Sequence, residues 1–442
     1  MDSSASLIVY VDFKSPYAYV ALGPTRALAD ELGIEVDWRP LTLDIPSFAG
    51  SARLGERDQV VESRRSPDQW AWVRYAYRDA RRYGALRGLV VRGTTKIWDS
   101  SLAAIGMLWA KQQGAAVLRR YMDTVFERFW KRELDIEDVA VIEGVLRESG
   151  ASTEGFRTHA AGEGRAAHDA EQRAIFASGI FGVPAYVVAG EELWGREHLP
   201  RIRWLLTGRT GPSPDIAYER AAASRATAKS AAGRHLSVSI DFKSPAAYLA
   251  LEPTCALADE LGIRIDWQPF VVAPRRKPVA LDTDADRGAR PRQFRAVYQA
   301  RDLERYAEAR GLELRDPDRE ADSTPAALAL LWLSGQPEPL VRDFVRRVFG
   351  LHFSGALALD DPEAIARVLA EVGAPTAGLE SFAREQGPAA LEALRAELVE
   401  AGVFDVPAYR LAGELFIGRQ HLPRIGELLS GAPASRAEER VS

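Results

Sequence analysis

Six consecutive residues near the N-terminus have the pattern of an anion-binding helix start. They directly follow an apolar run and read Asp12, Phe13, Lys14, Ser15, Pro16 and Tyr17. Serine is a good helix N-cap and proline a good first helical residue, so a strand should turn into a helix here. Free amides and the dipole at such an N-terminus stabilise an anion, either a phosphate or a thiolate. The alternative is that Ser15 only caps the helix and Pro16 only starts it.

A Val-Pro pair marks a second candidate site. Gly182-Val183-Pro184 precedes an expected strand, and Val406-Pro407 repeats the arrangement later in the chain. Proline cannot donate to a strand ladder, so here it indicates an edge, a bulge or a cis turn. An ordinary proline at the start of a strand is the alternative interpretation.

A third candidate site is a polar run with helical spacing, formed by Tyr75, Arg78, Asp79, Arg82 and Tyr83. Positions 75, 78, 79 and 82 lie three or four residues apart and are expected on one helical face. The two arginines could bind a substrate carboxylate through paired hydrogen bonds. A buried Arg–Asp network that supports the helices explains the same spacing.

Trp98 lies directly before another expected helix start. Asp99 and Ser100 both fit the N-cap position. A role for Trp98 in lining a hydrophobic substrate pocket is the alternative to a purely structural role.

The chain contains two copies of one unit. Residues 12–22 read DFKSPYAYVAL and residues 241–251 read DFKSPAAYLAL, which match at 9 of 11 positions with an offset of 241 − 12 = 229. Residues 181–186 and 404–409 match at an offset of 404 − 181 = 223. Chance agreement is about one in fifteen per position, so the sequence indicates a tandem duplication.

The repeat sets the expected domain organisation. A length of 442 residues suits two to four domains, and the repeat reduces this number to two. We expect domains at residues 1–207 and 235–430, a linker at 208–234 and a polar tail at 431–442. A flexible coil and a surface helix over residues 216–230 both fit the linker sequence.

Each unit has the order of a βαβ segment, a helical insertion and a ββα segment. In the first unit we expect strands at 7–13 and 34–43 around a helix that ends near Leu32, then helices between residues 67 and 178. A hairpin over residues 185–189 and 192–194 and a helix over 199–206 complete the unit.

Composition excludes several classes of protein. The balance of 57 basic and 62 acidic residues gives no strong field for nucleic acid or an anionic membrane. The single cysteine, Cys255, excludes intramolecular disulfides and cysteine-based zinc sites, and the 6 histidines show no metal-binding spacing. No apolar run is long enough to span a membrane, and residues 1–10 do not resemble a signal peptide. We therefore expect a cytoplasmic protein without a bound metal.

The order of elements and the two motifs resemble the DsbA-like thioredoxin fold, in the branch of kappa-class glutathione transferases and 2-hydroxychromene-2-carboxylate isomerases. Where DsbA-like oxidoreductases have Cys-Pro-His-Cys, this chain has Ser15-Pro16-Tyr17-Ala18 and Ser244-Pro245-Ala246-Ala247. The resemblance implies an α/β fold with two tandem thioredoxin-like domains, each with a large helical insertion.

The resemblance also implies glutathione as cosubstrate or cofactor, with Ser15, and Ser244 in the second copy, close to its sulfur. Val183 would pair its backbone with the cysteinyl part of glutathione, and Glu197 would receive the γ-glutamyl amine. His198 stands where the family has arginine. The implied glutathione-binding set comprises Lys14, Tyr17, Val183, Pro184, Glu197, His198, Val406 and Pro407; Tyr75, Arg78, Arg82 and Trp98 would line the substrate pocket.

The sequence departs from this branch in two respects. Residues 44–48 replace a Gly-Asn-x-Pro segment, and the chain contains no asparagine. The second copy has Ala246 where the first has Tyr17, and Gln420 where the first has Glu197. We therefore expect activity in the first unit, with the two copies forming an internal pseudo-dimer or the chain forming a homodimer.

Two functions follow as hypotheses. The first is a glutathione-dependent isomerase or transferase that acts on a hydrophobic, including aromatic, carboxylic substrate. The alternative is a non-catalytic binding or scaffold protein on a redox-dead thioredoxin fold. A thiol–disulfide oxidoreductase needs a cysteine at position 15 or 244, which the chain lacks.

Overall fold

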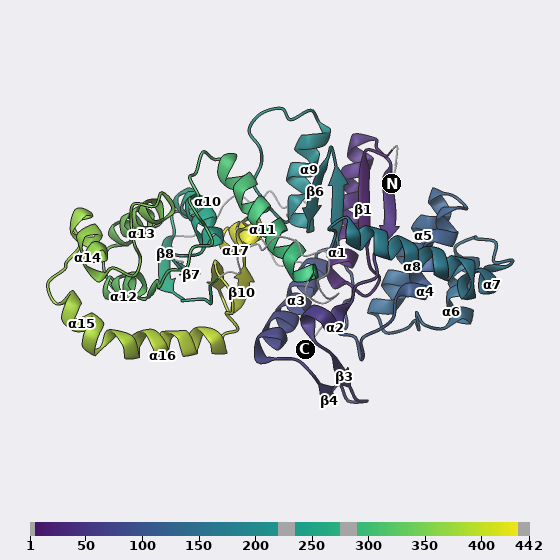
Figure 1. Ribbon diagram of the computed structural model, residues 1–442, viewed down its shortest axis with the longest axis horizontal. Coiled ribbons are helices and arrows are strands. Elements are labelled where there is room, and N and C mark those ends of the chain that lie inside the picture. Colours follow the sequence, from purple (N-terminus) through teal and green to yellow (C-terminus); the bar gives the residue numbers. More distant parts are fainter. Residues whose placement is uncertain (1–4, 220–234, 275–289, 432–442) are drawn as a thin grey trace. The chain divides into compact units, whose positions relative to one another are not determined.

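The computed structural model describes residues 5–219, 235–274 and 290–431 (Figure 1). These residues form two compact units. Unit 1 holds the described residues up to Pro214 together with residues 290–295, and unit 2 holds the remainder. Each unit contains its own four-stranded sheet.

The sheet of unit 1 has the strand order β2-β1-β5-β6. β1 pairs in parallel with β2 and antiparallel with β5, which pairs antiparallel with β6. The strands are β1 (Leu7–Val11), β2 (Val36–Pro40), β5 (Ala185–Val188) and β6 (Glu191–Trp194). The predicted order, a parallel pair followed late in the chain by a hairpin, is confirmed.

Helix α1 (Pro16–Leu32) connects β1 to β2 and has the predicted ends. Ser15 is its N-cap, and Gly33 ends it in the left-handed region with φ of 63°. Glycine adopts this conformation without a Cβ penalty, which explains the break before β2.

The helical insertion packs its aromatic residues against α1. Phe13 and Tyr19 contact Phe126 of α5 at centroid distances of 4.7 and 5.5 Å. Figure 1 shows α4–α7 gathered beside the sheet. The helices are α3 (Pro67–Ala85), α4 (Ser101–Lys111), α5 (Ala115–Trp130), α6 (Val139–Glu148), α7 (Phe156–Ala161) and α8 (Glu163–Ala177); the short helix η1 (Arg196–His198) and α9 (Leu199–Leu206) end the unit.

Three short elements between β2 and α3 have no counterpart in the sequence-based prediction. They are α2 (Ile45–Ala49), β3 (Ala52–Leu54) and β4 (Val60–Ser63), and β3 pairs antiparallel with β4. The two copies differ in length in this region, so the repeat gave no guidance there.

Unit 2 repeats this plan with the strand order β10-β9-β7-β8. Its strands are β7 (His235–Ile240), β8 (Arg264–Pro269), β9 (Ala408–Leu411) and β10 (Glu414–Ile417). Its helices are α10 (Pro245–Leu261), α11 (Arg290–Glu308) from Ala296 onward, α12 (Thr324–Trp332), α13 (Glu338–Phe353), α14 (Pro362–Glu371), α15 (Leu379–Glu385), α16 (Gly387–Glu400), η2 (Arg419–His421) and α17 (Leu422–Leu429).

The described linker residues from Asp215 onward are bound to unit 2. The carboxylate of Asp215 accepts hydrogen bonds from Arg310 and from Nε of Arg419, the latter at 3.0 Å. The Tyr218 amide donates to the Gln420 carbonyl at 2.8 Å. Residues 216–219 are not helical; residues 220–230 and the expected tail beyond residue 431 lie outside the described residues.

His352 of α13 should make unit 2 sensitive to acid. It is 2% exposed and lies against the Arg319 guanidinium. Burial, reinforced by the charge of Arg319, lowers the pKa of His352 from 6.5 to about 4. The unfolded chain therefore binds the extra proton first, so the stabilisation is complete above pH 6.5 and is lost as the pH falls toward 4.

We expect this effect to lower the unfolding free energy by up to about 3 kcal/mol between neutral pH and about pH 4. The measurement is urea unfolding at several pH values for the parent and for His352→Gln, which cannot take up a proton. The difference between the two curves isolates His352 from the carboxylates. Parallel pH dependences in the two proteins would contradict the prediction.

Candidate functional site

A buried carboxylate holds the loop between β1 and α1. Asp12 is 3% exposed, and it accepts hydrogen bonds from the amides of Lys14 (3.2 Å) and Leu43 (2.7 Å). Nζ of Lys14 lies 3.8 Å from the same carboxylate. Asp12 therefore ties the end of β1 to the segment after β2 and fixes the start of α1.

Ser15 occupies the N-cap of α1. Its Oγ accepts a hydrogen bond from the Ala18 amide at 3.2 Å, and the residue is largely buried. A serine hydroxyl that accepts one bond retains its own O–H for a second partner. Ser244 has the same geometry in unit 2, where Oγ accepts from the Ala247 amide at 3.2 Å.

The Val-Pro motifs have the same backbone form in both units but differ in their hydrogen bonds. The Val183–Pro184 and Val406–Pro407 peptide bonds are both cis. In unit 2 the Val406 amide donates to the Asp405 side chain at 2.8 Å. In unit 1 residue 182 is glycine, and within the described part of the chain no hydrogen bond to the Val183 backbone is found. The Val183 amide is thus open to a ligand, whereas the equivalent Val406 amide is bonded to Asp405.

The indole of Trp194 leaves no room for a side chain at position 182. A Cβ at position 182 would lie 2.5 Å from Nε1 of Trp194 in β6. The second copy has Asp405 in place of Gly182 and Ile417 in place of Trp194. The larger residue at the first position is therefore accompanied by a smaller side chain at the second.

The loop after β6 places Glu197 against Gly195. A Cβ on Gly195, whose φ is +106°, would lie 2.2 Å from Oε2 of Glu197. The carboxylate therefore folds back over the glycine, and only glycine at position 195 allows this arrangement. His198 is buried beside it with 2% exposure.

Tyr17 brings together residues from three parts of the sequence. Burial raises the pKa of Tyr17 well above its usual value, and the negative charge of Asp79 raises it further. Tyr75 and Glu197 act in the same direction, whereas Arg196 opposes them. Tyr17, Tyr75 and Glu197, predicted separately, therefore lie within electrostatic range of one another.

Helix α3 supplies a buried ion pair to this region. Nη1 of Arg82 lies 2.9 Å from Oδ1 of Asp79, with side-chain exposures of 6% and 1%. Tyr75 shares the buried face, but Arg78 is exposed, which corrects the expected grouping. At 3.6 residues per turn, position 78 lies about 60° from position 75 and about 100° from position 79, at the edge of the face.

Trp98 lies next to the start of α4. Its ring contacts Phe129 edge to face at 5.8 Å, and Nζ of Lys96 lies 4.2 Å from the ring centroid. Ser100 is the N-cap, but it is the Asp99 carboxylate that accepts a hydrogen bond from the Ser101 amide, at 2.9 Å. These contacts give Trp98 a packing role; no contact to the Ser15 loop is found among the described residues.

The start of α4 nevertheless faces the loop before α1. Desolvation acts to raise the pKa of Asp99, but hydrogen bonds from Ser101 and the charges of Arg165 and Lys14 lower it overall. In unit 2, hydrogen bonds from Thr324 and the charge of Lys243 likewise lower the pKa of Asp322. The Ser100 Oγ is buried here without a hydrogen-bond partner among the described residues.

Sequence reasoning missed two residues of this region. Arg196 is 2% exposed, and its guanidinium lies 4.5 Å from the centroid of the Tyr83 ring. The loop after β6 therefore does contain a buried guanidinium, but it belongs to Arg196 and not to the position of His198. Nε2 of His168 lies 3.1 Å from Oγ1 of Thr42. Thr42 directly precedes Leu43, whose amide donates a hydrogen bond to Asp12.

The comparisons with known proteins agree with this architecture. The family described as DSBA-like thioredoxin domain matches residues 6–206 and, a second time, residues 235–430. The chain belongs to this family. Its two family domains carry serine, at positions 15 and 244, at the start of the first helix. None of the curated proteins compared matches the chain.

Solved structures resemble one domain at a time. A 2-hydroxychromene-2-carboxylate isomerase has 21% identity and a TM-score of 0.36, covering 46% of this chain and 100% of its own. A probable DsbA oxidoreductase from Streptomyces coelicolor has 17% identity and a TM-score of 0.35, with coverages of 46% and 92%. The cytosolic disulfide reductase DsbM from Pseudomonas aeruginosa, solved with GSH, has 18% identity and a TM-score of 0.33, with coverages of 45% and 96%.

Cys255 of α10 is a buried free thiol. It is 1% exposed, and burial raises its thiol pKa to about 11, which disfavours the reactive thiolate. Among the described residues, no cluster of three or more His, Cys, Asp or Glu side chains could bind a metal. In the same part of the chain, no helix combines the length and apolar character needed to cross a membrane.

Proposed function

We propose that unit 1 is a glutathione-dependent isomerase or transferase domain for hydrophobic, including aromatic, carboxylic substrates. The observation that carries the proposal is the difference between the two Val-Pro motifs. The Val183 amide has no hydrogen-bond partner among the described residues, whereas Asp405 satisfies the Val406 amide in unit 2. A free backbone donor beside the helix start suits an extended peptide-like ligand.

The proposed glutathione site extends from Ser15 to Glu197. The Val183 backbone would pair with the cysteinyl part, and the Ser15 O–H would donate to the sulfur. Glu197 would receive the γ-glutamyl amine. The fit rests on the open Val183 amide and on a Ser15 hydroxyl that still has its own proton to donate.

When bound, glutathione supplies a thiolate that adds to an electrophilic carbon of the substrate and, in an isomerisation, leaves again. The protein's part is to keep the sulfur ionised and to position the substrate. The N-terminus of α1 and the Ser15 O–H both favour the thiolate over the thiol. Lys14 adds a nearby cation, although its charge is shared with Asp12 at 3.8 Å.

Tyr17 should act as a neutral hydrogen-bond donor rather than as a phenolate. Burial and the charge of Asp79 raise its pKa well above its usual value, so the hydroxyl keeps its proton at neutral pH. The hydroxyl could stabilise a developing negative charge on the substrate. Unit 2 has alanine at the equivalent position 246.

The test transfers the residues of unit 2 into unit 1. In the double variant Gly182→Asp/Trp194→Ile, the new aspartate should bind the Val183 amide as Asp405 binds Val406, without the clash at Trp194. We expect glutathione affinity, measured by calorimetry on the full chain, to fall about tenfold.

Trp194→Ile alone is the matched control, because it removes the same indole but leaves Gly182. It should retain most of the parent's affinity, and circular dichroism should show all three proteins folded. Unchanged affinity in the double variant would contradict the proposed role of Val183. No glutathione binding to the parent would instead favour the non-catalytic binding or scaffold protein.

A further inference from the structure

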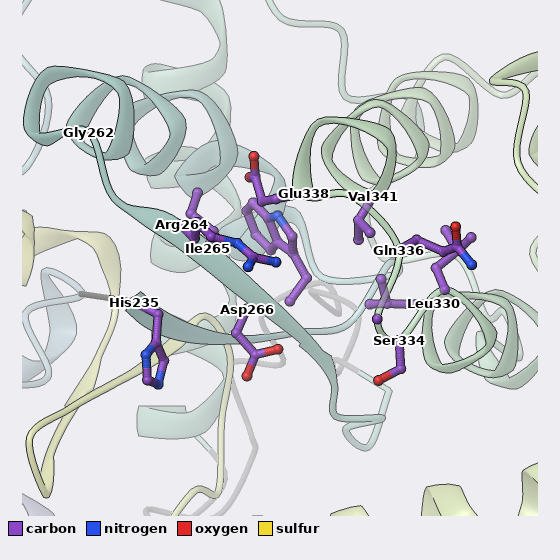
Figure 2. A pocket seen from close by; sticks show the side chains of 13 residues that line it. His235, Gly262, Arg264, Ile265, Asp266, Leu330, Ser334, Gln336, Glu338 and Val341 are labelled. Atoms are coloured by element: carbon purple, nitrogen blue, oxygen red, sulfur yellow. The ribbon is translucent and has the colours of Figure 1, made fainter. Parts of the chain in front are cut away.

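Unit 2 contains a cavity that lies away from Ser244. It has a volume of about 500 Å³ and lies between β8 and the turn from α12 to α13 (Figure 2). Its rim includes Gly262, which ends α10, and His235, which begins β7. Because α10 starts directly after Ser244 and has 17 residues, about 25 Å of helix separates the cavity from the helix start.

In unit 1, three cationic side chains lie around the equivalent acid and tryptophan. Nζ of Lys111 donates to the Asp37 carboxylate and, at 2.9 Å, to the Trp38 carbonyl. The guanidinium of Arg26 lies 5.8 Å from the centroid of the Trp38 ring. Arg39 also pairs with Asp37, at 2.7 Å. The acid of unit 1 is therefore neutralised within its own unit.

Unit 2 keeps the acid and the tryptophan but loses all three cations. Asp37 and Trp38 become Asp266 and Trp267 at the offset of 266 − 37 = 229. Their cationic neighbours become short or neutral residues: Arg26 corresponds to Cys255, Arg39 to Gln268, and Lys111, at the offset of 334 − 111 = 223, to Ser334.

The Asp266 carboxylate is solvent-exposed and has an open side. Its Oδ2 accepts hydrogen bonds from Gln268 at 2.7 Å and from Ser237 at 3.3 Å. Neither a hydrogen bond to its Oδ1 nor an ion pair is found within the described part of the chain. The indole N–H of Trp267, which also lines the cavity, is buried and has no partner there either.

Three other ionisable side chains line the cavity, namely His235, Arg264 and Glu338. Glu338 is paired with Arg342 at 2.9 Å and so does not compete for a ligand. Arg264 is exposed at the rim and forms no ion pair among the described residues. Figure 2 shows Arg264 and Asp266 on the same strand, with Leu330 and Val341 on the facing helices. The lining thus combines the Asp266 carboxylate and the Arg264 guanidinium with apolar side chains.

We propose that this cavity binds a small primary amine whose ammonium group takes the place that Lys111 fills in unit 1. The ammonium would pair with Asp266 and with the Trp267 carbonyl on the outer edge of β8, and the alkyl part would lie among Leu330, Leu333 and Val341. The Arg264 guanidinium would bind an oxygen acceptor elsewhere on the ligand. The proposal is independent of glutathione binding.

The experiment titrates the full chain with n-butylamine and with n-butanol, which has the same shape but no charge at neutral pH, and follows binding by NMR. We expect saturable binding of the amine and none of the alcohol. Asp266→Asn should weaken amine binding about tenfold, by loss of the charge pair. Ser334→Lys restores the residue of unit 1, fills the cavity and should abolish binding.

Asp360→Asn is the control for net charge, since Asp360 is exposed and does not line the cavity. It should bind the amine as the parent does. Equal binding of the amine and the alcohol, unchanged binding in Asp266→Asn, or no saturable binding to the parent would each overturn the proposal. Ser334 is exposed, so its replacement should not prevent folding.

Discussion

Ser15→Ala should weaken glutathione binding by about ten- to a hundredfold. A hydrogen bond to a charged partner contributes about 1.5–3 kcal/mol, and the proposed bond from the Ser15 O–H to the glutathione thiolate is of this kind. The bound sulfur should also become less acidic, because the helix N-terminus alone would remain to stabilise the thiolate. Calorimetry measures the affinity, and ultraviolet absorbance of the thiolate across a pH titration measures the acidity.

The same substitution removes the N-cap of α1, so stability must be separated from binding. Ser15 Oγ accepts the Ala18 amide at 3.2 Å, and loss of such a cap costs about 1 kcal/mol of stability. Ser244→Ala is the matched control, because Ser244 accepts the Ala247 amide at the same distance. It should lose similar stability and leave glutathione binding unchanged.

Two outcomes would contradict the role given to Ser15. If Ser15→Ala and Ser244→Ala bind glutathione equally well, Ser15 is only a helix cap. If Ser244→Ala alone loses affinity, the ligand binds in unit 2, and the hydrogen bond from Asp405 to the Val406 amide does not close that site.

The residues that sequence reasoning located best are those whose roles are local. The N-cap at Ser15, the glycine that ends α1 and the hairpin after Pro184 follow from backbone conformation within a few residues. The repeat strengthened each of them, because each motif was retained in both copies. The pattern of a βαβ segment, an insertion and a ββα segment followed for the same reason.

The residues that it missed depend on contacts between distant segments. Arg196 is a buried cation whose guanidinium lies against Tyr83, more than 100 residues earlier in the chain. His168 gains its partner Thr42 across a similar separation. The cavity beside β8 brings together Asp266 and Ser334, which are distant in the sequence and meet only in the folded unit.

The buried ion pair of α3 should have the largest effect on stability. Arg82→Met should reduce the unfolding free energy by about 3–5 kcal/mol, because it removes the cation 2.9 Å from a carboxylate that is 1% exposed. The equivalent pair in unit 2, Asp302 with Arg305, is 20% and 16% exposed. Arg305→Met should therefore cost clearly less, and urea unfolding of the two variants gives the comparison.

The ion pair also decides between the two interpretations of the arginine helix. If Arg82 mainly supports the fold, the double variant Asp79→Leu/Arg82→Met should recover most of the stability, because replacing both charges with apolar groups avoids an unpaired buried charge. If Arg82 instead binds a substrate carboxylate, the double variant should be stable but lose substrate affinity while it keeps glutathione affinity. A loss below about 1 kcal/mol in Arg82→Met would show that Asp79 is compensated by other groups, among which Arg196 is the cation that also acts on Tyr17. Adding Arg196→Met to Arg82→Met would then produce the loss of unfolding free energy that Arg82→Met alone did not.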